Sequence, residues 1–391
     1  MVHLVTAKSS GEEIELIRKS IRTLCGKFPE DYWKKLDEKN EYPEEFIKAL
    51  TEEGWLSVLI PEEYGGAGLG IAEASVILEE INRSGGNGAA GHAQMYTMGA
   101  LLNHGSEEQK QRYLPKIATG ELRLQAFGVT EPTAGSDTTN IITTAVRQGD
   151  KYIVNGQKIW ISRTKYSDLM LLLARTTPKE QVAKKTDGLS LFILDMNDQK
   201  DNITIRPIET MVNHATTEVF FENVEIPVEN LIGEEGKGFR YVLSGMNAER
   251  ILVASESIGD GYYFVDKAVQ YANERVVFSR PIGQNQGIQF PISKAYMNIE
   301  AAKLMRDKAA ALFDANEKGG AEANMSKYLA SEAAWEAANA AMDTYGGYGF
   351  AAEYHIERKF REARLFKIAP ISNNLVVSFV GQHVLGLPRS F

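Results

Sequence analysis

The hydrophobic period of this sequence changes twice, and that change constrains the fold more than any other feature. Residues 1–122 have the spacing of amphipathic helices; Ile14, Ile17, Ile21 and Leu24 fall on one helical stripe. Near residue 123 short strand-like runs begin, and from Phe239 the helical period returns. We predict a mainly helical α+β protein with domains over 1–122, 123–234 and 235–391, in which the two helical parts pack together.

The central section predicts a compact β domain. Short apolar runs cover residues 169–174, 189–196, 203–208 and 219–221. Residues 151–154 and 157–161 are joined by Asn155-Gly156, the strongest two-residue hairpin signal, so we predict a hairpin turn there. A domain of this size built from short strands is expected to be barrel-like or to consist of two packed sheets.

Composition excludes several classes of protein. The net charge of −9 disfavours a sequence-independent grip on nucleic acid. Cys25 is the only cysteine, so no internal disulfide forms, and we expect it to be buried filler. The six histidines show no metal-ligand spacing, so no metal is expected. Without a signal peptide or a long apolar run, we expect a cytoplasmic protein with no membrane span.

One phosphate-binding motif is a decoy. Gly86, Gly88 and Gly91 fit G-x-G-x-x-G, but residues 71–83 before them have helical rather than strand periodicity. A dinucleotide-binding fingerprint needs a strand that leads into the glycine turn. We therefore predict a turn between two helices.

The turn from Val129 to Asp137 is more informative. It ends a strand-like run and gathers Thr, Glu, Pro, Gly, Ser and Asp, whose amides and hydroxyls could hold a flavin and its pyrophosphate. Further motifs follow in order at residues 155–162, 233–239, 247–250, 346–350 and 356–364, and one precedes it at 61–66. Together these segments closely resemble the acyl-CoA dehydrogenase family, over about residues 12–386.

The resemblance implies a fold, a cofactor and an assembly. The fold would comprise an N-terminal helical domain, a central β domain and a C-terminal four-helix bundle, assembled as a homotetramer that is a dimer of dimers. The cofactor would be non-covalent FAD. By motif position its surroundings would include Phe127, Val129, Thr130, Gly135, Ser136, Trp160 and Ser162 from one subunit. Arg275, Phe278 and Gln286 match residues that are lent to a neighbouring subunit's FAD, and Ser372 and Asn374 match another part of its surroundings.

The resemblance also implies the reaction. A carboxylate removes the α-proton of an acyl-CoA thioester while the β-hydride goes to flavin N5, which introduces an α,β double bond. The electrons would pass to an electron-transfer flavoprotein. The resemblance thus implies an enzyme of fatty acid metabolism. Asn247, Arg250 and Ser136 are the candidate substrate-binding residues.

The identity of the base departs from the usual pattern. Most members carry it as the Glu of a Tyr-Glu-Gly-Thr motif, which falls here on residues 369–372 with Pro370 in place of Glu. The isovaleryl-CoA and long-chain members take a Glu from an earlier helix, and Glu249 matches that position. We predict Glu249 as the base, provided that burial outweighs the pKa-lowering charge of Arg250.

Pro370 leaves other chemistries open. It has no N–H to hold the thioester carbonyl, so the amide of Ile371 or another group must replace it. Relatives with this fold include flavin monooxygenases, nitroalkane oxidases and acyl-CoA desulfinases, which form the alternative class. A catalytically silent binding protein is the remote third reading.

Overall fold

The computed structural model describes residues 9–389, and it divides the chain into two compact units. The first unit comprises the chain up to Lys39, Leu69–His92 and everything from Asn247 onward. The second unit comprises Asn40–Gly68 and Ala93–Met246. Neither unit follows the three-part division predicted at residues 122 and 234, which stays a prediction.

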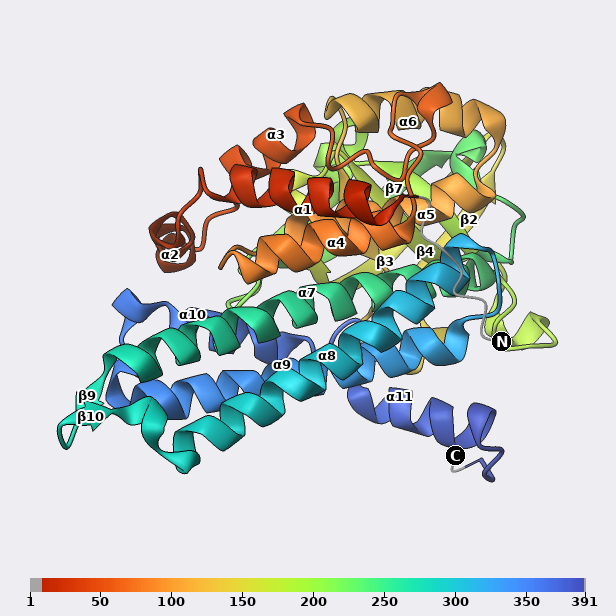
Figure 1. The fold of residues 1–391 in the computed structure, drawn as a ribbon. Helices are drawn as coiled ribbons and strands as arrows, with labels where there is room; N and C mark the ends of the chain where they lie inside the picture. Colours follow the sequence, from red (N-terminus) through yellow and green to blue (C-terminus); the bar gives the residue numbers. More distant parts are fainter. Residues whose placement is uncertain (1–8, 390–391) are drawn as a thin grey trace. The chain divides into compact units, whose positions relative to one another are not determined.

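The first unit is helical. Its helices are α1 (Gly11–Cys25), α2 (Glu30–Lys39), α4 (Ile71–Arg83), most of α7 (Gly238–Glu274), α8 (Gln286–Asp314), α9 (Gly320–Tyr345), α10 (Ile356–Leu365) and α11 (Asn373–Phe379), and it also holds the short hairpin of β9 (Val276–Val277) and β10 (Arg280–Pro281). One apolar cluster joins α7, α8, α9 and α10, and its many alanines allow the long helices to pack closely (Figure 1).

The N-terminal helices of this unit pack with the C-terminal ones, as predicted. The start of α4 is capped by a residue far along the chain, because the Asp314 carboxylate accepts from the N–H groups of Ile71 and Ala72 at 2.7 and 3.0 Å. Cys25 is buried at the end of α1, and burial raises the pKa of its thiol to about 12, as expected for a packing residue.

The second unit holds the large sheet. Its strands are β1 (Leu124–Gly128), β2 (Thr144–Gln148), β3 (Lys151–Ser162), β4 (Leu169–Arg175), β5 (Leu189–Asp195), β6 (Ile203–Pro207), β7 (Thr216–Pro227) and β8 (Leu231–Ile232), with helices α3 (Glu44–Glu52), α6 (Glu107–Thr119) and most of α5 (Ala89–His104). The strand order is β6-β7-β3-β2-β4-β5-β8, and β1 pairs in parallel with β4. The end strands β6 and β8 do not pair with each other in the described chain, so the sheet is not a closed barrel.

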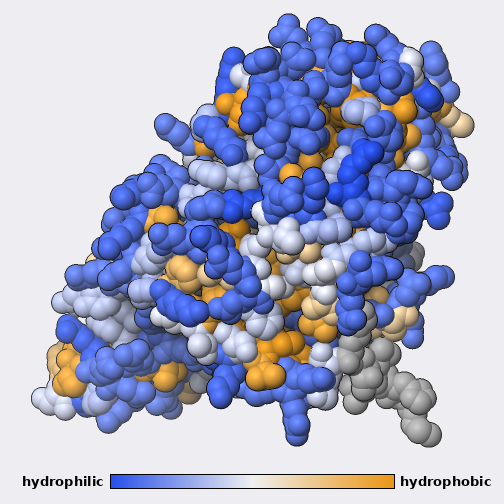
Figure 2. Space-filling view, turned by 90° about the horizontal axis from the view of Figure 1, so that it is seen from above, coloured by the Kyte–Doolittle hydropathy of each residue, from blue (hydrophilic) through white to orange (hydrophobic). Residues whose placement is uncertain are grey.

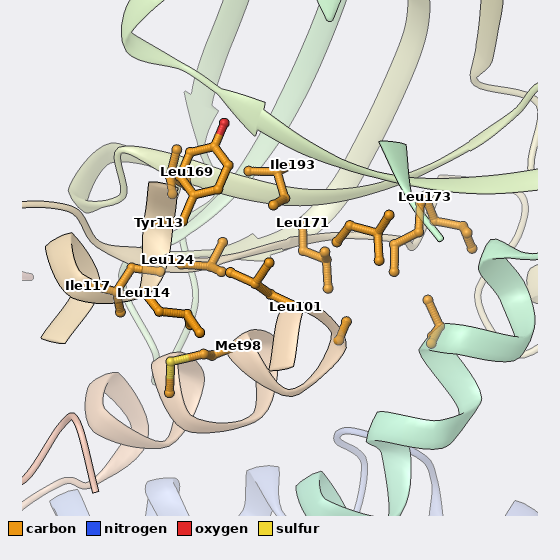
Figure 3. Packing of buried hydrophobic residues seen from close by; sticks show 14 of the residues in the cluster. Met98, Leu101, Tyr113, Leu114, Ile117, Leu124, Leu169, Leu171, Leu173 and Ile193 are labelled. Atoms are coloured by element: carbon orange, nitrogen blue, oxygen red, sulfur yellow. The ribbon is translucent and has the colours of Figure 1, made fainter. Parts of the chain in front are cut away.

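The continuous apolar run of β4 is explained by burial on both faces. Leu169, Leu171 and Leu173 belong to one buried cluster with Met98 and Leu101 of α5 and with side chains of α6 (Figure 3). Met170 and Leu172, on the other face of β4, lie against the inner faces of β3 and β7. The central strands are therefore covered by helices on one side and by folded-over sheet on the other.

The predicted hairpin at Asn155-Gly156 is wrong. β3 runs without a break from Lys151 to Ser162, and the chain reverses earlier, at Gly149-Asp150 between β2 and β3. Gly156 marks a bulge in the pairing of β3 with β7, and a Cβ there would lie 2.5 Å from the hydroxyl oxygen of Thr143. The glycine is needed for close packing within the strand rather than for a turn.

The surface is ordinary for the composition. The face in Figure 2 is mostly hydrophilic, with apolar side chains in scattered groups. No helix within residues 9–389 is long and apolar enough to cross a membrane.

Candidate functional site

The turn from Val129 to Asp137 follows β1 in the second unit, and a buried ion pair fixes it. The Lys158 ammonium, on β3, lies 2.8 Å from the Glu131 carboxylate and donates to the Val129 carbonyl at 3.0 Å. Glu131 also accepts from the N–H groups of Ile142 and Thr143 at 2.6 and 2.9 Å. All polar ends of this pair are therefore satisfied inside the protein.

Both members of the pair keep their charge at neutral pH. Burial opposes ionisation of Glu131, but the charge of Lys158 and the donated hydrogen bonds outweigh it and lower the pKa of the carboxyl. Burial lowers the pKa of Lys158 to about 8, which still leaves it mainly protonated at pH 7. The pair holds the turn against the sheet and leaves the other side of the turn open.

Trp160 is aimed outward by a strand irregularity. The Ile159 N–H donates to the Thr130 carbonyl at 2.9 Å, so β3 is attached to the turn at this point. The pairing with β7 then shifts between Lys158 and Ile161, and Trp160 takes a φ of 61°, which is unusual for a bulky residue. Its indole is 58% exposed, an uncommon state for a tryptophan beside a rigid turn.

Ser162 is prepared to donate a hydrogen bond. The Asn213 amide nitrogen, Nδ2, donates to the Ser162 hydroxyl oxygen at 2.7 Å. Since that oxygen already accepts a bond, its own hydrogen remains available to an acceptor outside. Asn213 was not singled out from the sequence, and its only sequence signal is its place in a polar loop before β7.

The remaining residues expected around the flavin lie on the same turn or on β1. Phe127 makes an edge contact with Tyr96 at a centroid distance of 5.6 Å. Ser136 is exposed, and a Cβ at Gly135 would meet nothing closer than the Thr130 methyl at 4.0 Å. An exposed indole, a donor hydroxyl and an open glycine turn form a surface that fits a flavin and its pyrophosphate.

Glu249 lies in the first unit, on α7, and its environment is that of a poised acid–base group. Its side chain is buried, and its Oε2 has no hydrogen-bond partner among residues 9–389. Burial raises the pKa of the carboxyl to about 7, against smaller opposing effects of His92 and Arg250. Burial therefore outweighs the charge of Arg250, which was the condition set by the sequence.

Arg250 turns toward its own helix. One guanidinium nitrogen, Nη1, donates to the Asn247 Oδ1 at 2.9 Å, and burial lowers the pKa of the group. No hydrogen bond joins Arg250 to Glu249 in the described chain. The three residues Asn247, Glu249 and Arg250 thus share one stretch of α7, with the carboxylate unpaired.

The segment around Pro370 is supported from beneath by a buried lysine. The Lys327 ammonium donates to the Ile371 carbonyl at 2.8 Å and to the Asn373 side chain at 2.6 Å. Ser372 caps α11 by accepting from the Leu375 N–H, and Asn374 is exposed. Pro370 offers no N–H, so the next backbone donor is that of Ile371.

Of the three residues expected to contact a neighbouring subunit's FAD, one lines a cavity and two are exposed. Arg275 lines a cavity of about 580 Å³ with Gly346, Gly347 and Tyr348, and its guanidinium lies 5.6 Å from the Tyr348 ring. Phe278 is at the tip of the β9–β10 hairpin and is 95% exposed. Gln286 begins α8 and is exposed, but it does not line this cavity.

Two buried residues near Glu249 were missed by sequence reasoning. His92 and Glu256 form a pair, with 3.0 Å between His92 Nδ1 and Glu256 Oε2. Glu256 follows Glu249 by seven residues, which places both on one face of a helix, so its spacing could have revealed it. His92 gave no such signal, because only the packing of α5 against α7 within the first unit brings it there.

The decoy motif is confirmed as a turn between helices. α4 ends at Arg83 and α5 begins at Ala89, so no strand leads into Gly86-x-Gly88-x-x-Gly91. The turn is closed by the Gly88 N–H, which donates to the Asn82 Oδ1 at 3.0 Å. A dinucleotide does not bind through this motif in the manner of its fingerprint.

Comparison with known proteins identifies the family. Sequence models of the N-terminal, middle and C-terminal domains of acyl-CoA dehydrogenase match residues 11–121, 126–224 and 236–385. The chain is 35% identical to acyl-CoA dehydrogenase FadE12 of Mycobacterium tuberculosis, over 99% of both chains. It is 34% identical to the caffeyl-CoA reductase–Etf complex subunit CarC of Acetobacterium woodii, over 91% of this chain and 94% of that protein.

The fold agrees with this assignment. The structure of glutaryl-coenzyme A dehydrogenase in its glutaryl-CoA complex matches with a TM-score of 0.91 and 32% identity, over 98% of both chains. The mainly helical architecture with one β-sheet domain, predicted from the change of period, is confirmed. The chain belongs to the acyl-CoA dehydrogenase family of FAD-dependent oxidoreductases.

Proposed function

We propose that the protein is an acyl-CoA dehydrogenase that forms an α,β double bond in an acyl-CoA thioester, with Glu249 as the base. The observation that carries this proposal is the buried, unpartnered Oε2 of Glu249 on a carboxyl whose pKa is about 7. A base matched to neutral pH takes a proton from carbon more effectively than a surface carboxylate does. The substrate would exclude further water and strengthen this effect.

Trp160, Ser162 and the open turn at Gly135 would hold the FAD, with Phe127, Val129, Thr130 and Ser136 around it. When bound, FAD supplies the acceptor for the β-hydride. The hydroxyl of Ser162, oriented by Asn213, would donate to a flavin acceptor, and the exposed indole of Trp160 would cover one face of the ring. This surface comes from the second unit alone.

By motif position in the family, Asn247, Arg250 and Ser136 would bind the substrate. The Ile371 N–H would replace the amide that Pro370 lacks, since Lys327 fixes the same residue through its carbonyl. In a homotetramer, Arg275, Phe278 and Gln286 would contact the FAD of a neighbouring subunit, and Ser372 and Asn374 would contribute another part of its surroundings.

The electron acceptor would be an electron-transfer flavoprotein. This rests on the family and on the relative CarC, whose name places it in a complex with Etf. Mixing the reduced enzyme with such a flavoprotein anaerobically should reoxidise the bound FAD.

The decisive experiment is anaerobic flavin reduction across a panel of short, branched and long acyl-CoAs. At least one should bleach the flavin absorbance of the purified holoenzyme. Glu249→Gln should retain FAD and reduce it about 10²- to 10⁴-fold more slowly, a loss typical of a removed general base. Unchanged reduction in that variant would exclude Glu249 as the base, and a panel without bleaching would exclude the dehydrogenase reaction.

A second candidate is the same chemistry run toward the saturated thioester. It is favoured by the relative CarC, which is named as a caffeyl-CoA reductase subunit. Dithionite-reduced enzyme should then be reoxidised without oxygen by an α,β-unsaturated acyl-CoA, and Glu249 would return the proton to the α-carbon. If oxygen alone rapidly reoxidises the reduced flavin and yields peroxide or an oxygenated product, a flavin monooxygenase or oxidase reaction is favoured instead.

A further inference from the structure

A row of buried carboxylates runs along one face of α7. Glu249, Glu256 and Asp260 are spaced seven and four residues apart, which places them on the same side of the helix. All three are buried, Glu249 the least, at 6% exposure. Carboxylates in such positions destabilise the fold unless they are paired or protonated. The pairing of each carboxylate therefore indicates whether it carries a charge.

The three carboxylates are paired to different degrees. Asp260 lies 2.6 Å from the Lys359 ammonium and accepts from the Asn82 side chain at 2.9 Å. Glu256 has the His92 ring at 3.0 Å. Glu249 alone has no cation within ion-pair distance in the described chain.

The glycine turn before α5 allows His92 to reach this face. A Cβ at Gly88 would lie 2.9 Å from Asn82 Oδ1 and 3.1 Å from Glu256 Oε1, so a larger residue there would require these side chains to shift. His92 then stands in the first turn of α5 with its ring against Glu256. The motif that resembled a dinucleotide fingerprint thus has a different structural use.

We infer that His92 and Glu256 are positioning residues for Glu249, and that together they set the proton affinity of the proposed base from two helical turns away. The inference rests on the proposed function only for the role of Glu249. Seven residues of helix separate the Cα atoms of Glu249 and Glu256 by about 10.5 Å. At that range in a protein interior, one charge shifts a pKa by about one unit.

The charges that face Glu249 act in opposite directions. From α5, His92 favours the carboxylate form; from α7, Arg250 also favours it and Glu256 opposes it. From α9, Lys327 interacts with Arg250. Because His92 and Glu256 touch each other, removing either one leaves the other as an uncompensated influence on the base.

Because these two effects oppose each other, removing His92 and removing Glu256 should shift the pKa of Glu249 in opposite directions. In the holoenzyme without substrate, the protonation of Glu249 can be followed by infrared difference spectroscopy, as the carboxyl band that disappears in Glu249→Gln. His92→Gln removes the neighbour that favours the carboxylate form of Glu249 and should raise the titration midpoint by about one pH unit. Glu256→Gln keeps the size of the side chain, removes a negative neighbour and should lower the midpoint by a similar amount.

The same shifts should appear in the pH profile of flavin reduction. The pH at which the rate of flavin reduction falls on the acidic side should be higher in His92→Gln and lower in Glu256→Gln. Thermal melting and FAD content show whether each variant is folded. His355→Asn is the matched control, because His355 is also in the first unit beside a carboxylate, that of Asp31 at 3.7 Å. Asparagine tolerates the left-handed backbone of that position.

Each outcome decides the inference. Opposite shifts of the infrared midpoint support it, whereas shifts of the same sign, no shift, or an equal shift in His355→Asn overturn it. If the titrating band persists in Glu249→Gln, the midpoint belongs to another carboxyl. That result also overturns the inference. Since this titration uses no substrate, it is independent of whether any acyl-CoA reduces the flavin.

Discussion

At the scale of a single residue, the proposed base Glu249 also affects the stability of the fold. Folding raises the pKa of its carboxyl from 4.5 to about 7, mainly by burial, so the folded state favours the protonated form. Its stabilisation is present in full below pH 4.5 and is lost as the pH rises through 7. The same rise would produce the carboxylate that the proposed reaction needs.

Glu249→Gln should therefore stabilise the protein in alkali. Glutamine carries no charge at any pH, so the free energy of unfolding at pH 8 should exceed that of the wild type by up to about 3 kcal/mol. Near pH 5 the difference should shrink to about 1 kcal/mol or less. Urea unfolding at both pH values measures it, and an equal effect at both would contradict the pKa assigned to Glu249.

The sequence located this residue but could not describe its neighbours. The helix motif placed Glu249 and Arg250 together, and only the structure shows that Arg250 bonds to Asn247 instead. His92 lies 157 positions before Glu249 in the chain, a separation across which no periodic pattern operates. Pairing inside a core depends on packing angles that a sequence does not state.

At the scale of elements, the turn from Val129 to Asp137 depends on β3. Removing the Lys158 charge leaves Glu131 as an unpaired buried carboxylate, so Lys158→Met should lower the free energy of unfolding by about 3–5 kcal/mol. Adding Glu131→Gln should restore part of this loss. Chemical unfolding measures both variants.

A second lysine of the same strand provides the control. Lys151 pairs with Glu225 at the surface, so Lys151→Met should change the free energy of unfolding by less than about 1 kcal/mol. If Lys158→Met were as mild as this, the turn would not depend on the buried pair.

The irregular backbone of β3 at Trp160 should increase FAD affinity and lower the stability of the strand. Glycine adopts the φ of Trp160 without strain, so Trp160→Gly should leave the apoprotein as stable as the wild type or about 1 kcal/mol more stable. FAD affinity should fall, because the exposed ring is lost. Trp160→Phe should retain much of the affinity. Flavin titration of the apoprotein measures this, and unchanged binding in Trp160→Gly would contradict the role of the indole.

Elements were predicted well where local chemistry decides them. Ser106 and Gly120 bound α6 through signals that a sequence displays directly, since the serine caps its first turn and the glycine ends it in a left-handed conformation. Asn155-Gly156 misled because the same dipeptide suits a bulge as well as a turn. The buried pairing of β3 with β7, which is not local, decided between the two.

At the scale of the whole molecule, Phe278 is an aromatic residue that the described chain leaves almost fully exposed. It stands at a hairpin tip with a φ of 51° and is 95% exposed. Phe278→Ser should therefore not lower the melting temperature of a monomer. It should weaken self-association and FAD retention if the proposed tetramer uses this hairpin.

Sedimentation velocity and flavin content test that prediction together. Leu16→Ser is the control, because Leu16 is 63% exposed on α1 and has no expected role in assembly. A Phe278→Ser protein with unchanged association and flavin content would remove the hairpin from the proposed interface.

The first unit is assembled from three separated stretches of the chain, and this has a consequence for its synthesis. Glu79 of α4 is buried and pairs with Arg18 of α1 at 2.7 Å and with Arg306 of α8 at 2.6 Å. While the ribosome makes the intervening 226 residues, that carboxylate has no Arg306 to meet. The second unit, whose last stretch ends at Met246, is fully translated before α8 begins. The helix bearing Glu249 therefore reaches its final environment only after the sheet of the second unit has had time to form.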